Sequence, residues 1–300
     1  MKVEKNMLKF SAAGGLFFAV FGIVWGITIK SDMIMFDGLY SLISLFLSIL
    51  AIWITNYIEK SDYEKFPFGK EILEPITVAF KSLVLIVMCT ITFINAVKEV
   101  IAGGNAIDTE MAMGYSIISS VGCAFIYLYI AKKSKKISSE IVKAESNQWL
   151  MDTLLSVAVL VGFVISCILE FTPLSYLTRY VDPCMVILSS SIFLRVPIQS
   201  LIQSFNEIIN RNADEDIKDE IYTLVKNIEE EYNFEDSITR VSKVGRELRI
   251  EIDFVYNEDS TLNEINEMDK VREKLYKNMS NIKLKKWMNV NFTGDRKWAV

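Results

Sequence analysis

The stretch MIMFDGLYSLISLFLSILAIWITNY, residues 33–57, decides the fold. It is longer than the roughly 20 apolar residues that cross the ~30 Å hydrocarbon core of a bilayer. Asp37 is its only charged residue, and a second acid, Asp152, lies in another apolar stretch. A carboxylate at a helix centre costs about 2.5–3.5 kcal/mol on insertion scales, so it is seldom placed there without a function. These two acids are therefore the first candidates for functional residues.

Five further stretches have a similar length and composition, and 51% of the 300 residues are hydrophobic. The sequence therefore predicts an α-helical membrane protein with six transmembrane helices. We place the spans at Leu8–Ile29, Met33–Tyr57, Ile72–Ile101, Met111–Ile130, Trp149–Leu169 and Pro183–Phe205. The first stretch is too long for the core of a signal peptide and lacks a convincing small-residue cleavage site, so we expect a retained span.

Lysine residues gather on one side of the predicted spans. Lys60, Lys65 and Lys70 follow the second span, a lysine cluster at 132–136 follows the fourth, and the loops on the other side carry almost no lysine or arginine. The positive-inside rule then places both termini in the cytoplasm and the protein in the cell membrane. The net charge of -5 comes from the C-terminal segment and makes nucleic acid an unexpected partner.

The apolar stretches end at Phe205, and a charged segment of domain length follows. Its periodicity predicts the order α-β-β-α-β. We expect helices at Asp214–Glu231 and Leu262–Asn278, the second capped by Ser260 and Thr261, and strands at Ile238–Val244, Leu248–Val255 and Trp287–Phe292. Each strand has one apolar side, which favours a three-stranded sheet with helices on one face, a ferredoxin-like or metallochaperone-like α+β domain. The predicted domains are a transmembrane domain, residues 1–210, and a cytoplasmic domain, residues 211–300.

Polar residues recur at steps of three and four along three predicted spans, which places them on one face of each helix. They are Asp37, Tyr40, Ser41, Ser44 and Ser48 in the second span, Glu74, Thr77 and Lys81 in the third, and Glu145, Gln148, Asp152 and Ser156 in the fifth. Stripes that each carry a carboxylate favour a polar pathway. Two structural alternatives stay open: hydroxyls that only bond a backbone carbonyl or a neighbouring helix, and an ion pair of Asp152 with Lys81.

Histidine is absent from the chain, which removes the commonest transition-metal ligand and the usual proton carrier near pH 7. Any metal chemistry must therefore depend on oxygen. The four cysteines are interpreted as small apolar filler between helices: Cys89, Cys123, Cys167 and Cys184. No pair of nucleophile and base is visible, so we expect neither an enzyme nor a tightly bound cofactor.

Four segments, together with the six spans and the α-β-β-α-β domain, resemble the cation diffusion facilitator (cation efflux) family of divalent-metal transporters. They are Phe36-Asp37-Gly38-Leu39-Tyr40-Ser41, Phe66-Pro67-Phe68-Gly69-Lys70 with Glu74, Gln148-Trp149-Leu150-Met151-Asp152 with Leu155-Ser156, and Val181-Asp182-Pro183. The similarity covers most of the chain. It implies a homodimeric secondary transporter that exports a divalent cation in exchange for protons.

The resemblance also implies a transport site, carried over by position. It consists of Tyr40 and Ser44 in the second span and Gln148 and Asp152 in the fifth, and Asp37 fits the acidic residue usually found just before the first of these ligands. Only Asp152 matches an ionised ligand, so the chain is a divergent member without the usual histidines. Oxygen ligands favour hard ions such as manganese or magnesium over zinc, with iron and cobalt also possible cargo.

Residue counting places Asp37 toward the outer end of the second span and Asp152 toward the inner end of the fifth. A second functional hypothesis therefore stands beside transport: a membrane scaffold or sensor that keeps the fold without moving ions. The missing ligands motivate it, and so does Lys81, a built-in cation that could take the place of a metal.

Overall fold

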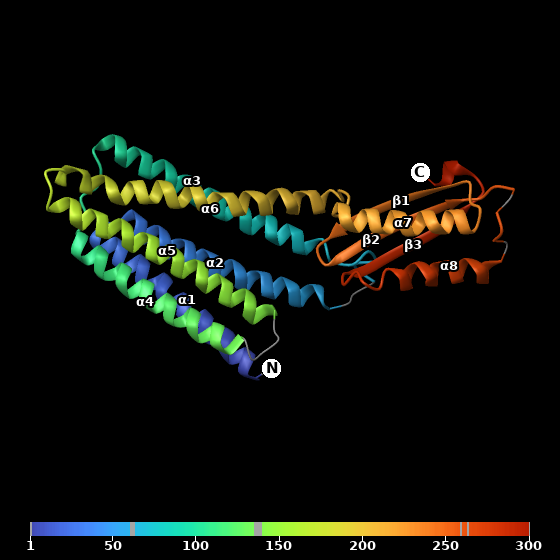
Figure 1. Ribbon diagram of the computed structural model, residues 1–300, viewed down its shortest axis with the longest axis horizontal. Coiled ribbons are helices and arrows are strands. Elements are labelled where there is room, and N and C mark those ends of the chain that lie inside the picture. Colours follow the sequence, from blue (N-terminus) through green and yellow to red (C-terminus); the bar gives the residue numbers. More distant parts are fainter. Residues whose placement is uncertain (1, 61–63, 135–139, 259, 263, 300) are drawn as a thin grey trace. The chain divides into compact units, whose positions relative to one another are not determined.

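The computed structural model describes the backbone of all residues except 1, 61–63, 135–139, 259, 263 and 300, and leaves out the side chains of 2–8, 133, 134, 140–145 and 147 as well. Its long helices (Figure 1) are α1 Lys2–Ile29, α2 Asp32–Ile58, α3 Leu73–Ala102, α4 Thr109–Ser134, α5 Glu140–Glu170 and α6 Thr178–Ile208. Among the described residues, six helices are long and apolar enough to cross a membrane, and each overlaps one predicted span. The six-span prediction is confirmed. Glu145 and most of the lysine cluster after the fourth span lie outside the described side chains.

The six helices carry large apolar side chains on their outer surfaces. Phe46, Trp53 and Leu188 are each largely exposed, as lipid-facing positions of a membrane helix are. The buried side chains instead gather between the helices, where Met33, Phe36 and other residues form an apolar cluster. Together these features describe a multi-pass membrane protein.

Glycines let α1 and α2 approach each other closely. A Cβ atom on Gly38 would lie 2.6 Å from the backbone nitrogen of Ile23, and one on Gly26 would lie 2.6 Å from the backbone nitrogen of Met35. No side chain fits at such distances, so small residues at this crossing bring the two backbones together. The crossing fixes the stretch of α2 that carries Asp37.

The start of the sixth span differs from the prediction. Helix α6 begins at Thr178, so Pro183 lies inside it and does not mark its first residue. Proline lacks an N–H and leaves the carbonyl four residues earlier without its helical partner. That carbonyl belongs to Arg179, and it accepts a hydrogen bond of 2.7 Å from the backbone nitrogen of Asn105. A tertiary contact therefore satisfies the group that the proline leaves free.

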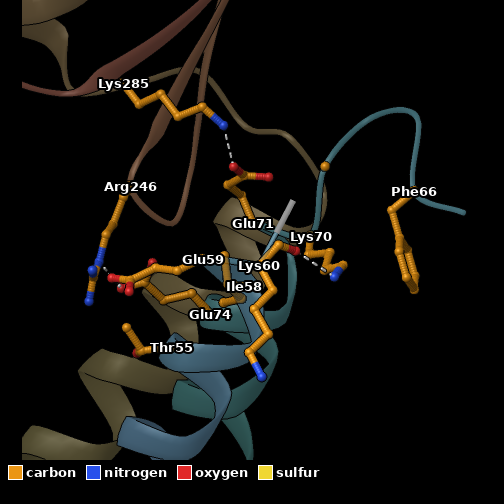
Figure 2. A pocket seen from close by; sticks show the side chains of 11 residues that line it. Thr55, Ile58, Glu59, Lys60, Phe66, Lys70, Glu71, Glu74, Arg246 and Lys285 are labelled. Carbon is orange, nitrogen blue, oxygen red and sulfur yellow. Dashed lines mark hydrogen bonds and ion pairs between the residues drawn. The ribbon is translucent and has the colours of Figure 1, made fainter. Parts of the chain in front are cut away.

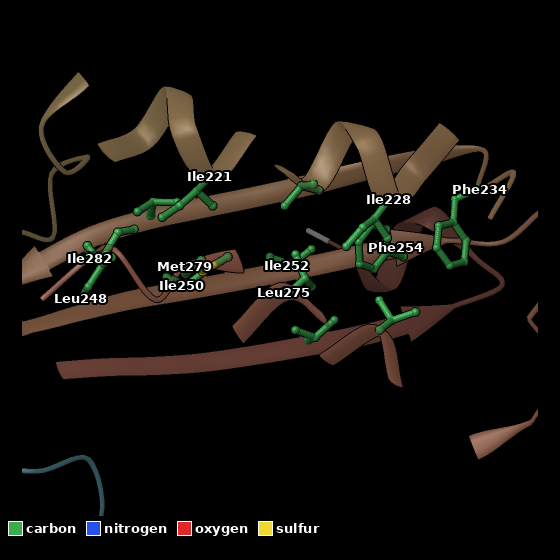
Figure 3. Packing of buried hydrophobic residues seen from close by; sticks show 14 of the residues in the cluster. Ile221, Ile228, Phe234, Leu248, Ile250, Ile252, Phe254, Leu275, Met279 and Ile282 are labelled. Atoms are coloured by element: carbon green, nitrogen blue, oxygen red, sulfur yellow. The ribbon is translucent and has the colours of Figure 1, made fainter. Parts of the chain in front are cut away.

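The C-terminal region has the predicted order α-β-β-α-β (Figure 1). Its elements are α7 Glu215–Glu231, β1 Asp236–Val244, β2 Glu247–Val255, α8 Ile265–Asn278 and β3 Lys285–Thr293. Strand β2 is central, antiparallel to β1 and parallel to β3. Figure 3 shows the core between the sheet and the helices, where Leu248, Ile250 and Ile252 of β2 are fully buried. The α+β prediction is confirmed.

The cap of α8 was predicted at the wrong residues. The N-cap position is Glu264, whose backbone nitrogen donates to the Glu267 carboxylate at 3.4 Å. Ser260 and Thr261 instead hold the preceding loop, because Ser260 Oγ donates to the Asn233 carbonyl at 2.9 Å and the Thr261 backbone nitrogen donates to the Tyr232 carbonyl at 3.1 Å. Because the loop after α7 uses these two residues, α8 begins at Ile265 and not at the predicted Leu262.

By their internal contacts, the residues form two compact units. The first contains Met1–Leu50 and Lys81–Gln199, and the second contains Ala51–Phe80 and Ser200–Val300. The α+β region thus shares the second unit with the end of α2, the start of α3 and the end of α6. Within this unit, the Glu207 carboxylate of α6 accepts a bond of 3.0 Å from the Gly245 backbone nitrogen of the β1–β2 turn. The domain boundary at residue 210 stays a prediction.

Candidate functional site

Asp37 lies on α2 in the first unit, and it is partly buried. Its carboxylate accepts a hydrogen bond of 3.1 Å from the hydroxyl of Tyr115 on α4. A Cβ atom on Gly22 of α1 would lie only 2.8 Å from that hydroxyl oxygen, so the absence of a side chain on α1 makes room for the donor. Three helices therefore cooperate to place one hydrogen bond on this membrane carboxylate.

The polar face of α4 continues from Tyr115 toward α5. Ser119 lies one helical turn beyond Tyr115, and its hydroxyl is 3.1 Å from the hydroxyl of Ser156 on α5. Ser156 in turn donates to the Cys123 sulfur at 3.9 Å. Ser119, Ser156 and Cys123 are all buried, so these polar groups are shielded from lipid and lie inside the bundle.

Asp152 lies on α5 one turn before Ser156. Ser156 contacts Ser119 of α4, and Ser119 lies one turn beyond Tyr115, which donates to Asp37. The structure thus brings the two carboxylates into one polar region, although residue counting separates them along the membrane normal. Tyr40 follows Asp37 by three residues on the same face of α2, and its ring packs against Phe193 with 4.4 Å between ring centroids.

Ser44 and Ser48 continue the stripe of α2. Ser48 Oγ donates to the Ser44 carbonyl at 2.8 Å, which is the structural alternative for a membrane serine. Lys81 of α3 donates to Ser48 Oγ at 3.3 Å. A hydroxyl is therefore a partner of Lys81, and the alternative pair with Asp152 stays a prediction. Lys81 stands beside the stripe as a cation held by a hydroxyl.

Gln148 differs from the other predicted site residues because it is exposed. Its side chain makes no hydrogen bond to the stripe within the described part of the chain. Likewise, no three histidine, cysteine, aspartate or glutamate side chains among the described residues are arranged to hold a metal ion. The charged donors present are therefore two separate carboxylates with neutral hydroxyls around them.

Another buried acid, Asp182 of α6, stabilises the start of α2. Its carboxylate accepts bonds from Ser31 Oγ at 2.6 Å and from the Asp32 backbone nitrogen at 2.8 Å. The first N–H groups of a helix have no partner within the helix, so an acceptor from a neighbouring helix satisfies them. Asp182 is fully buried, and its role is to anchor the helix that carries Asp37.

Sequence reasoning missed the contribution of α4. Tyr115, Ser119 and Cys123 recur at steps of four, which is a signal of a shared helix face. None of them is charged, so this face lacks the costly carboxylate that marks the stripes of the second and fifth spans. The spacing alone could have predicted a third polar stripe.

Comparison with known proteins agrees with this architecture. Residues 8–209 match the family described as the cation efflux transmembrane domain. The chain is also 27% identical over 164 residues to the uncharacterized transporter MJ0449 of Methanocaldococcus jannaschii, which covers 55% of this chain and 58% of that protein. The chain therefore spans less than two thirds of that relative. Since the family match extends over more than half of the chain, this protein belongs to the cation efflux family.

Proposed function

We propose that this protein is a secondary transporter that moves a divalent metal cation across the membrane in exchange for protons. The observation that carries the proposal is the polar face of α4 inside helices that are otherwise apolar. On that face Tyr115 donates to Asp37, and Ser119 contacts Ser156, one turn from Asp152. Membership of the cation efflux family supports cation transport in general, and the name of the relative describes a transporter.

In this proposal, the two carboxylates supply the charge and neutral groups complete the site. Asp37 and Asp152 bind the cation, and Tyr40 and Ser44 lie on the same face of α2 as Asp37. Gln148 joins them by turning inward from its exposed position. Oxygen donors suit a hard cation such as manganese or magnesium better than zinc.

The exchange with protons follows from charge balance. Two carboxylates in a membrane are neutralised either by one divalent cation or by two protons, and either state avoids an uncompensated charge in a low-dielectric surrounding. Rocking of helices then opens the site to one side at a time, as in other secondary transporters. We further propose export from the cytoplasm, a homodimer in the cell membrane and cytoplasmic termini.

The proposal is tested by manganese flux in vesicles reconstituted with purified protein. We expect Asp152→Asn and Asp37→Asn each to lower flux by about tenfold or more, since neutral oxygens alone bind a divalent cation poorly. Glu110→Gln removes a carboxylate from the exposed first turn of α4 and is the matched control. Wild-type flux in Asp152→Asn, with the protein folded and inserted, would contradict the proposed site.

A scaffold or sensor without transport is the second candidate, and the position of Lys81 favours it. Its ammonium reaches Ser48 on the stripe of α2, so the chain already places a positive charge beside the proposed path. Absence of flux for every divalent cation in wild-type vesicles, with the protein folded, would support this second function over the first.

A further inference from the structure

A cavity of about 360 Å³ lies in the second unit, where α2 ends and α3 begins (Figure 2). Its lining comes from the end of α2, the segment before α3, the first turn of α3 and the α+β region. The lining residues are Thr55, Ile58, Glu59, Lys60, Phe66, Gly69, Lys70, Glu71, Glu74, Arg246 and Lys285. The cavity is well away in sequence from the carboxylates of the proposed transport site.

Lys70 is the unusual member of this lining because it is only 6% exposed. Its Nζ donates to the Lys60 carbonyl at 2.9 Å, and the rings of Tyr57 and Phe66 have their centroids 4.3 and 4.9 Å away. In the described part of the chain, no carboxylate pairs with it. A buried ammonium has three N–H donors and normally requires a charged partner, but the described residues give this group only a carbonyl and two aromatic rings.

The other charges of the cavity are mostly paired with each other. Arg246 lies 3.2 Å from the Glu74 carboxylate, and Lys285 pairs with Glu71, as Figure 2 shows. Lys285 also lies 2.9 Å from Glu247 outside the lining. Apart from these pairs, the charged residues of the lining are two lysines, Lys60 and Lys70, and one acid, Glu59. The remaining charge of the cavity is therefore positive.

The position and walls of the cavity restrict the anion further. One candidate membrane span ends at Ile58 and the next begins at Leu73, so the cavity lies where two spans end. Ile58 and Phe66 add apolar wall to it. Basic pockets at helix ends suit the head groups of anionic lipids, because phosphate oxygens accept bonds from lysine and the acyl chains stay in the bilayer.

We propose that this cavity binds a phosphate group through the ammonium group of Lys70, with Lys60 on its rim adding positive charge. The phosphate belongs either to the head group of an anionic phospholipid or to a free phosphate in solution. Binding supplies a charged partner that the described residues do not give Lys70. The site does not depend on the proposed transport function.

The experiment measures binding to the purified full chain in detergent. Native mass spectrometry with added phosphatidylglycerol or phosphatidylcholine tests the lipid, and isothermal titration with inorganic phosphate tests the soluble anion. Three variants are compared with wild type: Lys70→Met, which keeps the buried length without the charge; Lys60→Gln on the exposed rim; and Lys132→Gln, which removes an exposed lysine at the end of the fourth span and serves as the control.

We expect phosphatidylglycerol to bind more tightly than phosphatidylcholine, and Lys70→Met to weaken it about tenfold, the loss of one charge-assisted hydrogen bond. Lys60→Gln should weaken it by a smaller factor, and Lys132→Gln should leave it unchanged. The same lysine dependence seen only with inorganic phosphate would support the site with a soluble ligand. Equal binding of both ligands by wild type, Lys70→Met and Lys60→Gln would overturn the proposal, as would an equal loss in Lys132→Gln.

Discussion

The hydrogen bond from Tyr115 to Asp37 depends on the missing side chain of Gly22, and Gly22→Ala tests this dependence. The new Cβ atom would lie 2.8 Å from the Tyr115 hydroxyl oxygen and 3.0 Å from Gly38 Cα, while ordinary contact begins at 3.4 Å. The hydroxyl has to withdraw by about 0.6 Å, which is enough to lengthen a bond of 3.1 Å beyond hydrogen-bonding distance.

The expected loss of stability has two parts. Overpacking at a helix crossing costs about 1–3 kcal/mol, and a lost hydrogen bond to a carboxylate costs about 1.5–3 kcal/mol. Alanine regains up to about 1 kcal/mol of helix propensity. We therefore expect Gly22→Ala to lower the free energy of unfolding by about 1.5–5 kcal/mol. Tyr115→Phe removes the same bond without the clash and should lower it by about 1.5–3 kcal/mol.

The assay is reversible unfolding in mixed detergent micelles, run as a double-mutant cycle. Both single variants lose the same hydrogen bond, so the double variant should be at least about 1 kcal/mol more stable than the sum of the two losses predicts. Gly15→Ala is the matched control on α1, because a Cβ atom there has no neighbour within 4 Å. Additive losses, or an equal loss in Gly15→Ala, would refute the dependence of the Tyr115 bond on Gly22.

Two further predictions concern lysines. Lys285→Met should destabilise the chain by about 1 kcal/mol after solvent screening, because Lys285 joins two largely buried carboxylates, Glu71 and Glu247. Lys297→Met should destabilise it less, because the partner of Lys297, Asp295, is exposed. Hydrogen bonds to these carboxylates raise the pKa of Lys285. Burial raises the pKa of Glu71, but the Lys285 hydrogen bond, the backbone hydrogen bonds and the charge of Lys285 together outweigh burial, so the pKa of Glu71 lies below its ordinary 4.5. The contribution of these ion pairs to stability is therefore present between about pH 5 and 10. It is lost as pH falls through the lowered pKa of Glu71 and as pH rises through the raised pKa of Lys285. Thermal unfolding of Lys285→Met and wild type, compared across pH, checks both limits. Lys81→Gln should tighten manganese binding in a working transporter, since it removes a positive charge beside the site, and a titration that shows weaker or unchanged binding would contradict that electrostatic role.

The elements of the fold follow from local patterns, and the exceptions have tertiary causes. Run lengths predict the six spans, and alternation predicts the three strands, because both depend on which side chains must leave water. The predicted start of α6 at Pro183 was wrong, because the proline is tolerated inside the helix. The hydrogen bond from Asn105 to the Arg179 carbonyl makes this possible, and it joins residues too far apart for a local sequence pattern to reveal. The cap of α8 moved to Glu264 because the loop after α7 uses Ser260 and Thr261.

The candidate site was predicted in part, and the missing part concerns relations between helices. Asp37 and Asp152 stand out because a charge in an apolar run is costly whatever surrounds it. Their common region could not be predicted, because the relative height of two helices depends on close contacts such as those at Gly38 and Gly26. Gln148 was predicted from its position in the family pattern, but its side chain is exposed, because sequence position does not fix which way a side chain faces in the bundle.

Helix α4 gives the two carboxylates different surroundings within the polar region. Asp37 already holds the Tyr115 hydroxyl, whereas α4 approaches α5 through Ser119 and Cys123, one turn from Asp152. A bound hydroxyl offers a hydrogen bond without a full charge, so it lowers the cost of an ionised carboxylate without neutralising it. Asp37 can therefore stay in the bundle as a partly satisfied acid. The attraction between a divalent cation and the summed charge of both acids is stronger than the hydrogen bond from the Tyr115 hydroxyl. In the proposed transporter, α4 thus donates a hydrogen bond to Asp37 and leaves the negative charge of this acid available to a cation.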